Sequence, residues 1–170
     1  MALYFGTFNP MHAGHLAILN YLRRKGFSEV RMVVSPESPF KQGSDQTAEA
    51  RLEAVRAKVA GLCPDVIVSD IEFNLPKPNY TINTLHKLQA EEPDTEFVIA
   101  MGADNIAGIE RWREWEEIVD NYEIWVYPRK GYYVKRKCKK YGARYLEDAK
   151  LVNISSTQIR EGKADKNLMI

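Results

Sequence analysis

The stretch "ALYFGTFNPMHAGHLAILNYLRRKG", residues 2–26, combines a short apolar run, a glycine-bearing loop and an amphipathic segment. The run "ALYF" (2–5) is apolar and β-prone, which is typical of a buried strand, and Gly6 ends it. A helix is predicted from His15 to a stop at Gly26, because leucines recur there every three positions. The stretch therefore predicts a strand, a loop and a helix in that order.

The rest of the chain repeats this alternation. Further strands are predicted at 30–34, 66–68, 96–102 and 123–127. Helices are predicted around 48–59, 82–88 and 112–119, with a basic helix within 134–140 and a last short helix from Thr157. Strands that alternate with helices imply right-handed βαβ units and a mostly parallel sheet. We therefore expect one α/β domain over 1–170, with a single doubly wound, mostly parallel sheet and a ligand beyond the carboxyl ends of its strands.

Composition excludes several classes of protein. The 170 residues are 45% hydrophobic and 28% charged, which is ordinary for one globular domain. A formal net charge of +1 gives no support to a nucleic-acid-binding protein. The local cluster "VKRKCKK" (134–140) is interpreted as a solvated helix face.

The two cysteines, Cys63 and Cys138, fit no zinc spacing and no disulfide framework, so a reducing compartment is the simplest inference. No apolar run reaches the ~18 residues that span a bilayer. The first residues lack the basic region and apolar stretch of a signal peptide. We expect a cytoplasmic protein without a membrane or nucleic-acid partner.

Two histidines, His12 and His15, stand where the first strand gives way to the first helix. Backbone N–H groups at a helix start are unpaired and the helix dipole favours an anion there. Gly6 and Gly14 let the backbone approach a bulky ligand closely. The pattern favours a phosphate cradle with two imidazole donors. A purely structural helix cap and a metal site remain open, although no third metal ligand lies nearby in the sequence.

Several stretches carry a resemblance to a known family. The stretch "GTFNPMHAGH" (6–15) resembles the H-x-G-H signature of nucleotidyltransferases, and "ISSTQIR" (154–160) resembles their second signature. The stretches "MGADNIAGIERWREW" (101–115) and "NYTINTL" (79–85) resemble bacterial nicotinate-nucleotide adenylyltransferases. The resemblance runs from Leu3 to Gly162. It implies a Rossmann-like nucleotidyltransferase fold and the reaction of ATP with nicotinate mononucleotide to give deamido-NAD and pyrophosphate, with Mg2+ bound through the ATP phosphates.

The resemblance also implies roles for individual residues. Those implied in catalysis are His12, His15 and Arg160. Those implied in ATP binding are Gly6, Thr7, Phe8, Gly14, Gly102, Asp104, Ile154, Ser155, Ser156 and Thr157. Those implied in binding the acceptor mononucleotide are Lys41, Tyr80, Thr81, Trp112 and Arg129. No residue is assigned to a metal ion held by the protein itself.

Each implied role has a plainer alternative. Alone, "SSTQ" (155–158) is an ordinary helix cap, Asp104 is an N-cap, and Lys41 is a solvated loop lysine. Trp112 shares helical spacing with Trp115, which is also typical of a core residue; we favour stacking for Trp112 and the core for Trp115. The resemblance favours the functional role in each case.

The arrangement itself is testable. We expect His12, His15 and Arg160 to line a single cleft, and Lys41 and Arg129 to enter it from the acceptor side. Lys130 departs from the Arg-Pro-Gly that family members usually carry in this loop, and family members usually continue with a further helix after "GKADKNLMI" (162–170).

Other functions stay open. The acceptor could instead be nicotinamide mononucleotide or phosphopantetheine, and the chain could be a non-catalytic nucleotide-binding module. A redox enzyme with a bound dinucleotide is disfavoured because G-x-G-x-x-G is missing. A homo-oligomer is compatible with the sequence. The sequence does not decide between nicotinate mononucleotide and nicotinamide mononucleotide as the acceptor.

Overall fold

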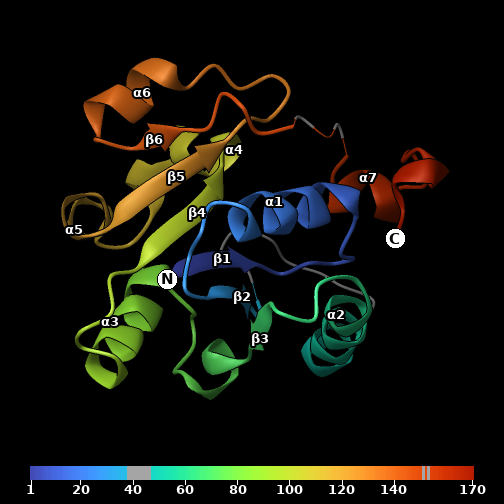
Figure 1. Ribbon diagram of the computed structural model, residues 1–170, viewed down its shortest axis with the longest axis horizontal. Helices are drawn as coiled ribbons and strands as arrows, with labels where there is room; N and C mark the ends of the chain where they lie inside the picture. The colour runs from blue at the N-terminus through green and yellow to red at the C-terminus, as the bar shows by residue number, and fades with distance from the viewer. Residues whose placement is uncertain (38–46, 151, 153) are drawn as a thin grey trace.

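A central parallel sheet organises the computed structural model, which describes residues 1–37, 47–150, 152 and 154–170 (Figure 1). The sheet has six strands in the order β3-β2-β1-β4-β5-β6, and every neighbouring pair is parallel. The strands are β1 (Ala2–Gly6), β2 (Val30–Val34), β3 (Ile67–Ser69), β4 (Val98–Gly102), β5 (Glu123–Tyr127) and β6 (Arg144–Tyr145). The predicted doubly wound sheet is confirmed.

Helices connect these strands and cover both faces of the sheet. They are α1 (Ala13–Arg23), α2 (Ala48–Leu62), α3 (Thr81–Glu91), α4 (Ala103–Ala107), α5 (Trp115–Asn121), α6 (Lys135–Lys140) and α7 (Ser156–Arg160). Short 3-10 turns lie at η1 (Ile71–Asn74), η2 (Ile109–Arg111) and η3 (Lys166–Leu168). None of the described helices is long and apolar enough to span a membrane.

Two apolar cores form because successive strand residues point to opposite faces. On β1, Tyr4 packs with α1 and α2 on one face, whereas Leu3 packs with α3 to α6 on the other. On β4, Ala100 and Ile99 divide in the same way. A parallel strand covered on both faces is apolar throughout, which explains why the runs 2–5 and 98–101 show no polar alternation.

The predicted helix at 112–119 is wrong in its first half. The turn η2 ends at Trp112, whose backbone is extended (φ −79°, ψ 147°). Glu114 then takes a left-handed conformation (φ 52°), and α5 begins only at Trp115. A non-glycine residue in that region breaks a right-handed helix. Trp112 and Trp115 therefore do not share one helix face, although their spacing suggested it.

The strand order reverses between β1 and β4. The chain runs outward from β1 through β2 to β3, returns to β4, and runs outward again to β6. Connections on the two sides of this reversal diverge, which leaves a crevice beyond the carboxyl ends of β1 and β4. The loop that contains His12 leaves β1 at this point, and Asp104 follows β4 there.

Candidate active site

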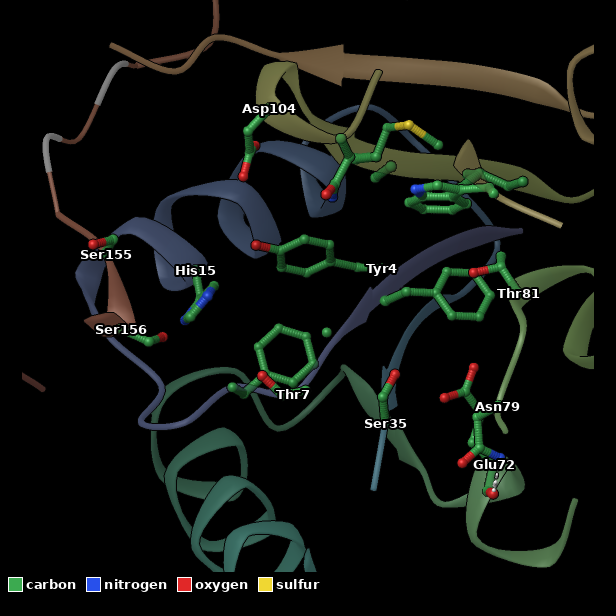
Figure 2. Close-up of a pocket in the computed structure, with 18 of the residues that line it drawn as sticks. Tyr4, Thr7, His15, Ser35, Glu72, Asn79, Thr81, Asp104, Ser155 and Ser156 are labelled. Atoms are coloured by element: carbon green, nitrogen blue, oxygen red, sulfur yellow. Dashed lines mark hydrogen bonds between the residues drawn. The ribbon is translucent and has the colours of Figure 1, made fainter. Parts of the chain in front are cut away.

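A cleft of about 240 Å³ opens at this reversal of the strand order. Figure 2 shows His15, Ser155 and Ser156 at one end of it, Thr81, Asn79 and Glu72 at the other, and the Tyr4 ring between them. The predicted site residues that line it are Gly6, Thr7, Phe8, His12, His15, Tyr80, Thr81, Asp104, Trp112, Arg129, Ser155, Ser156, Thr157 and Arg160. Gly14, Gly102 and Ile154 are not among the lining residues but contact residues that are. Lys41 lies outside the described residues.

The two histidines form a reciprocal cap at the start of α1. The Nδ1 atom of His12 accepts a hydrogen bond from the Gly14 backbone N–H at 3.2 Å. The Nδ1 atom of His15 accepts one from the His12 backbone N–H, also at 3.2 Å. The two rings stack with centroids 3.7 Å apart. Because each Nδ1 accepts a hydrogen bond, each neutral ring carries its proton on Nε2.

The capping role and the phosphate role are therefore compatible. Each histidine uses Nδ1 for the backbone, and each ring lines the cleft. Capping fixes the rings at the helix start, where the dipole also attracts anions. Among the described residues, no group of three or more histidine, cysteine, aspartate or glutamate side chains could hold a metal ion.

The second signature lies against the first. Ser155 caps α7, and its hydroxyl accepts the Gln158 N–H at 3.2 Å. The Ser156 hydroxyl donates to the Pro10 carbonyl at 3.0 Å, and the Arg160 guanidinium donates to the Asn9 carbonyl at 2.6 Å. These bonds join α7 to the loop after β1, so the two signatures share one cleft as expected. Ser155 and Ser156 therefore lie at the same end of the cleft as His15 (Figure 2), and we call this the phosphate end because phosphate binding is expected there.

Arg129 was expected on the acceptor side, but it contacts residues at the phosphate end of the cleft. Its Nε is 3.6 Å from the Asp104 carboxylate, and its Nη1 donates to the Ile154 carbonyl at 3.2 Å. A Cβ at Gly102 would stand 2.2 Å from the Asp104 carboxylate, so a larger residue there would require the Asp104 side chain to move. Asp104 does not cap α4, because the N-cap is Gly102 and Asp104 lies in the first turn. Arg129 thus joins the β4 end to the second signature.

The other end of the cleft begins at α3. Tyr80 is the N-cap of α3 and Thr81 its first residue, and both line the cleft. Trp112 is half-buried, with part of its ring against the core on this face and part lining the cleft. Trp115 does not line it and packs edge-on against Tyr141, with ring centroids 5.3 Å apart.

Sequence reasoning missed a buried polar cluster at this end. Glu72 is 3% exposed and accepts hydrogen bonds from the hydroxyls of Thr84, at 2.9 Å, and Ser35. The Asn79 amide donates to the backbone carbonyl of Glu72 at 2.8 Å. Burial raises the pKa of Glu72 above its ordinary value. A glutamate between the apolar residues Ile71 and Phe73 was the available signal.

Comparison with known proteins fits this geometry. A model of the cytidylyltransferase-like family matches residues 3–162. A probable nicotinate-nucleotide adenylyltransferase of Bacteroides fragilis is 43% identical over 95% of this chain and 81% of its own length. One of Flavobacterium psychrophilum is 40% identical over 99% of this chain and 89% of its own. The chain belongs to the nicotinate-nucleotide adenylyltransferases of the cytidylyltransferase-like family.

Solved structures show that the fold of this adenylyltransferase family is shared widely. A Plasmodium falciparum nicotinic acid mononucleotide adenylyltransferase complexed with NaAD superposes with a TM-score of 0.78 over 98% of this chain and 86% of its own, at 18% identity. A putative nicotinate-nucleotide adenylyltransferase of Vibrio parahaemolyticus gives 0.66 over 99% and 91%, at 24% identity. At these identities the likeness establishes the sheet and its helices.

The surroundings of His12 keep its imidazole ring neutral. Its side chain is 1% exposed, and an antiparallel bridge places Met169 beside it. Burial lowers the pKa of His12 to about 4, and the positive charges of Arg129 and Lys58 add to the effect. At neutral pH the ring is therefore uncharged and donates through Nε2.

This pKa predicts a pH dependence of stability. The unfolded chain has a histidine pKa near 6.5 and the folded chain about 4, so the unfolded state binds more protons between these values. The contribution of His12 is complete above about pH 6.5 and is lost as the pH falls toward 4. We expect the wild type to lose about 2 kcal/mol more stability than His12→Asn between pH 7.5 and pH 5.

Urea unfolding at several pH values measures this difference. Asparagine is a good helix N-cap and retains an acceptor near the Nδ1 position, so His12→Asn removes the titration and keeps the cap. If the difference in the free energy of unfolding between the wild type and His12→Asn is the same at pH 7.5 and pH 5, the lowered pKa of His12 is contradicted.

Proposed function

We propose that this chain transfers AMP from ATP to nicotinate mononucleotide, giving deamido-NAD and pyrophosphate. One observation carries the proposal: the two signatures, far apart in the sequence, converge on a single cleft with His12, His15 and Arg160 in its wall. Similar proteins from other bacteria are named for the same acceptor, which supports this choice. The polar and aromatic end around Thr81 and Trp112 is suited to a planar, substituted ring.

The chemistry asks for charge stabilisation more than for a nucleophile from the protein. A phosphate oxygen of the mononucleotide attacks the α-phosphorus of ATP, a new P–O bond forms, and the bond to the departing pyrophosphate breaks. In this proposal His12 and His15 donate Nε2–H to the phosphates as charge develops. Arg160 neutralises the leaving pyrophosphate. Catalysis then rests on orientation and on preorganised donors.

The remaining roles follow from position. Gly6, Thr7, Phe8 and Gly14 border the phosphates along the loop after β1. On the other side, Ser155, Ser156 and Thr157 offer hydroxyls and N–H groups at the start of α7. Ile154, Gly102 and Asp104 border the bound nucleotide. Arg129 stands between the two substrates, held by Asp104 and the Ile154 carbonyl, and we assign it to the acceptor phosphate.

Mg2+ is proposed to enter with ATP. Such ions keep several waters and are held by one or two carboxylates and the substrate phosphates. In the described part of the cleft, Asp104 is the carboxylate beside the phosphate end and is its one candidate protein ligand. When bound, the ion neutralises negative charge on the triphosphate. The described residues fit an ion carried by ATP.

The setting of the reaction is also part of the proposal. Both cysteines are buried and unbridged, which suits the reducing cytoplasm. We place the enzyme there, acting on two small nucleotides.

A pyrophosphate-release assay tests the proposed reaction. ATP is supplied with nicotinate mononucleotide, nicotinamide mononucleotide or phosphopantetheine in turn. We expect the highest kcat/KM with nicotinate mononucleotide. Binding of ATP without release of pyrophosphate from any of the three mixtures would instead indicate a non-catalytic nucleotide-binding module.

A further inference from the structure

Three arginines line the described part of the cleft, and one of them stands apart from the phosphate end. Arg129 and Arg160 are tied to the second signature and to the loop after β1. The guanidinium of Arg113 instead lies over the Tyr80 ring, 5.5 Å from its centroid. Tyr80 directly precedes Thr81, which Figure 2 shows at the opposite end from His15 and Ser155. The cleft therefore has a cation at each end.

The guanidinium of Arg113 is only partly engaged. Its Nε contacts the neighbouring Glu114 carboxylate at 3.3 Å, and both side chains are half-exposed. Its two terminal nitrogens have no hydrogen-bond partner among the described residues. An exposed contact of this kind contributes little, so it competes weakly with a ligand.

The acidic groups at the same end are already paired. Glu37 forms an ion pair with Lys77 at 2.6 Å. Glu72 is buried and accepts hydrogen bonds from Thr84 and Ser35. Arg113 is therefore the charged group at this end that is best placed to meet an anion.

We propose that Arg113 pairs with the ring carboxylate of the mononucleotide and gives this chain its preference for nicotinate over nicotinamide. The inference rests on the proposed function, because that acceptor carries two anionic groups, a phosphate and a ring carboxylate, at its two ends. A planar guanidinium can bind a carboxylate through two parallel hydrogen bonds. The carboxamide of nicotinamide is neutral and cannot form the charged pair.

The neighbours of Arg113 fit this role. Trp112 immediately before it lines the cleft and offers a flat face to the pyridine ring. The Tyr80 ring beneath the guanidinium holds it by a cation–π contact and limits its freedom. A ring stacked on Trp112 would carry its substituent next to residue 113.

The experiment compares kcat/KM for the two mononucleotides at saturating ATP in the wild type, Arg113→Gln and Arg113→Lys. We expect the nicotinate-to-nicotinamide ratio to fall about tenfold in Arg113→Gln, the low end for a hydrogen bond to a charged group because the site is half-exposed. The loss should appear in KM for nicotinate mononucleotide, with KM for ATP unchanged. Arg113→Lys should keep part of the ratio because it keeps the charge.

Arg136→Gln is the matched control, since it removes the same charge from an exposed position on α6 outside the cleft. It should leave the ratio unchanged. If the nicotinate-to-nicotinamide ratio is unchanged in Arg113→Gln, the inference is overturned and recognition of the ring carboxylate is assigned to backbone N–H groups. Calorimetry gives the ratio of dissociation constants for the two mononucleotides even if the wild type turns over neither, so failure of the proposed reaction and failure of this inference are distinguishable.

Discussion

Replacing His15 with alanine is expected to lower kcat about 100-fold or more, while KM for ATP changes much less. That loss is the scale of removing one preorganised donor to charge that develops in the transition state. The His15 ring is 7% exposed and packs edge-on against Phe8, with centroids 5.0 Å apart. Its orientation is thus fixed before substrate binds, as such a donor requires. Steady-state kinetics with both substrates varied would measure the effect.

Two further variants separate catalysis from capping. His15→Asn keeps an acceptor near the Nδ1 position, which caps the His12 N–H, but has no donor near Nε2. His15→Gln places an amide donor near the Nε2 position. We expect His15→Asn to unfold like the wild type yet lose most activity, and His15→Gln to recover part of it. A His15→Asn variant with wild-type kcat would show that the residue serves only the helix start.

Replacing Trp112 with alanine is expected to raise KM for the mononucleotide far more than KM for ATP. The change should correspond to about 1–3 kcal/mol, the scale of stacking between a base and an aromatic side chain. Trp112 lines the cleft but is also half-packed into the core, so some loss of stability is expected as well. Separate KM values for the two substrates measure the first effect and thermal unfolding the second.

Trp112→Phe and Trp115→Ala are the controls. Phenylalanine keeps a flat ring and should recover most of the mononucleotide affinity. Trp115 packs against Tyr141 away from the cleft, so its loss should lower stability and leave both KM values alone. Equal rises in both KM values for Trp112→Ala would mean that Trp112 is a core residue.

The sheet could be predicted because local and tertiary preferences agree along it. The runs 2–5, 32–34 and 124–127 are apolar, and each lies in a strand whose side chains pack into the cores on both faces of the sheet. The segment at Trp112 could not be predicted in the same way. Its helical spacing is real, but the backbone turns at Glu114 and leaves one tryptophan in the cleft and the other in the core.

The site shows the same division. The family resemblance predicted that His12, His15 and Arg160 share one cleft, because each lies within a contiguous signature. The reciprocal cap between the histidines could not be predicted from the sequence, because it depends on which backbone N–H group lies next to each Nδ1 atom. The family resemblance assigned no role to Arg113 or Glu72, and only the folded structure shows that both line the cleft. The role of Lys41 stays a prediction.

The attachment of α7 to the loop after β1 bears on the order in which the protein is completed during translation. Synthesis begins at the N-terminus, so all six strands are synthesised before Ser156 and Arg160 are. A nascent chain that stops after β6 would hold both histidines and the Trp112 end, but only one wall of the phosphate site. Such a product could capture the mononucleotide without releasing pyrophosphate. The second wall of the phosphate site is therefore the last part of the cleft to be completed.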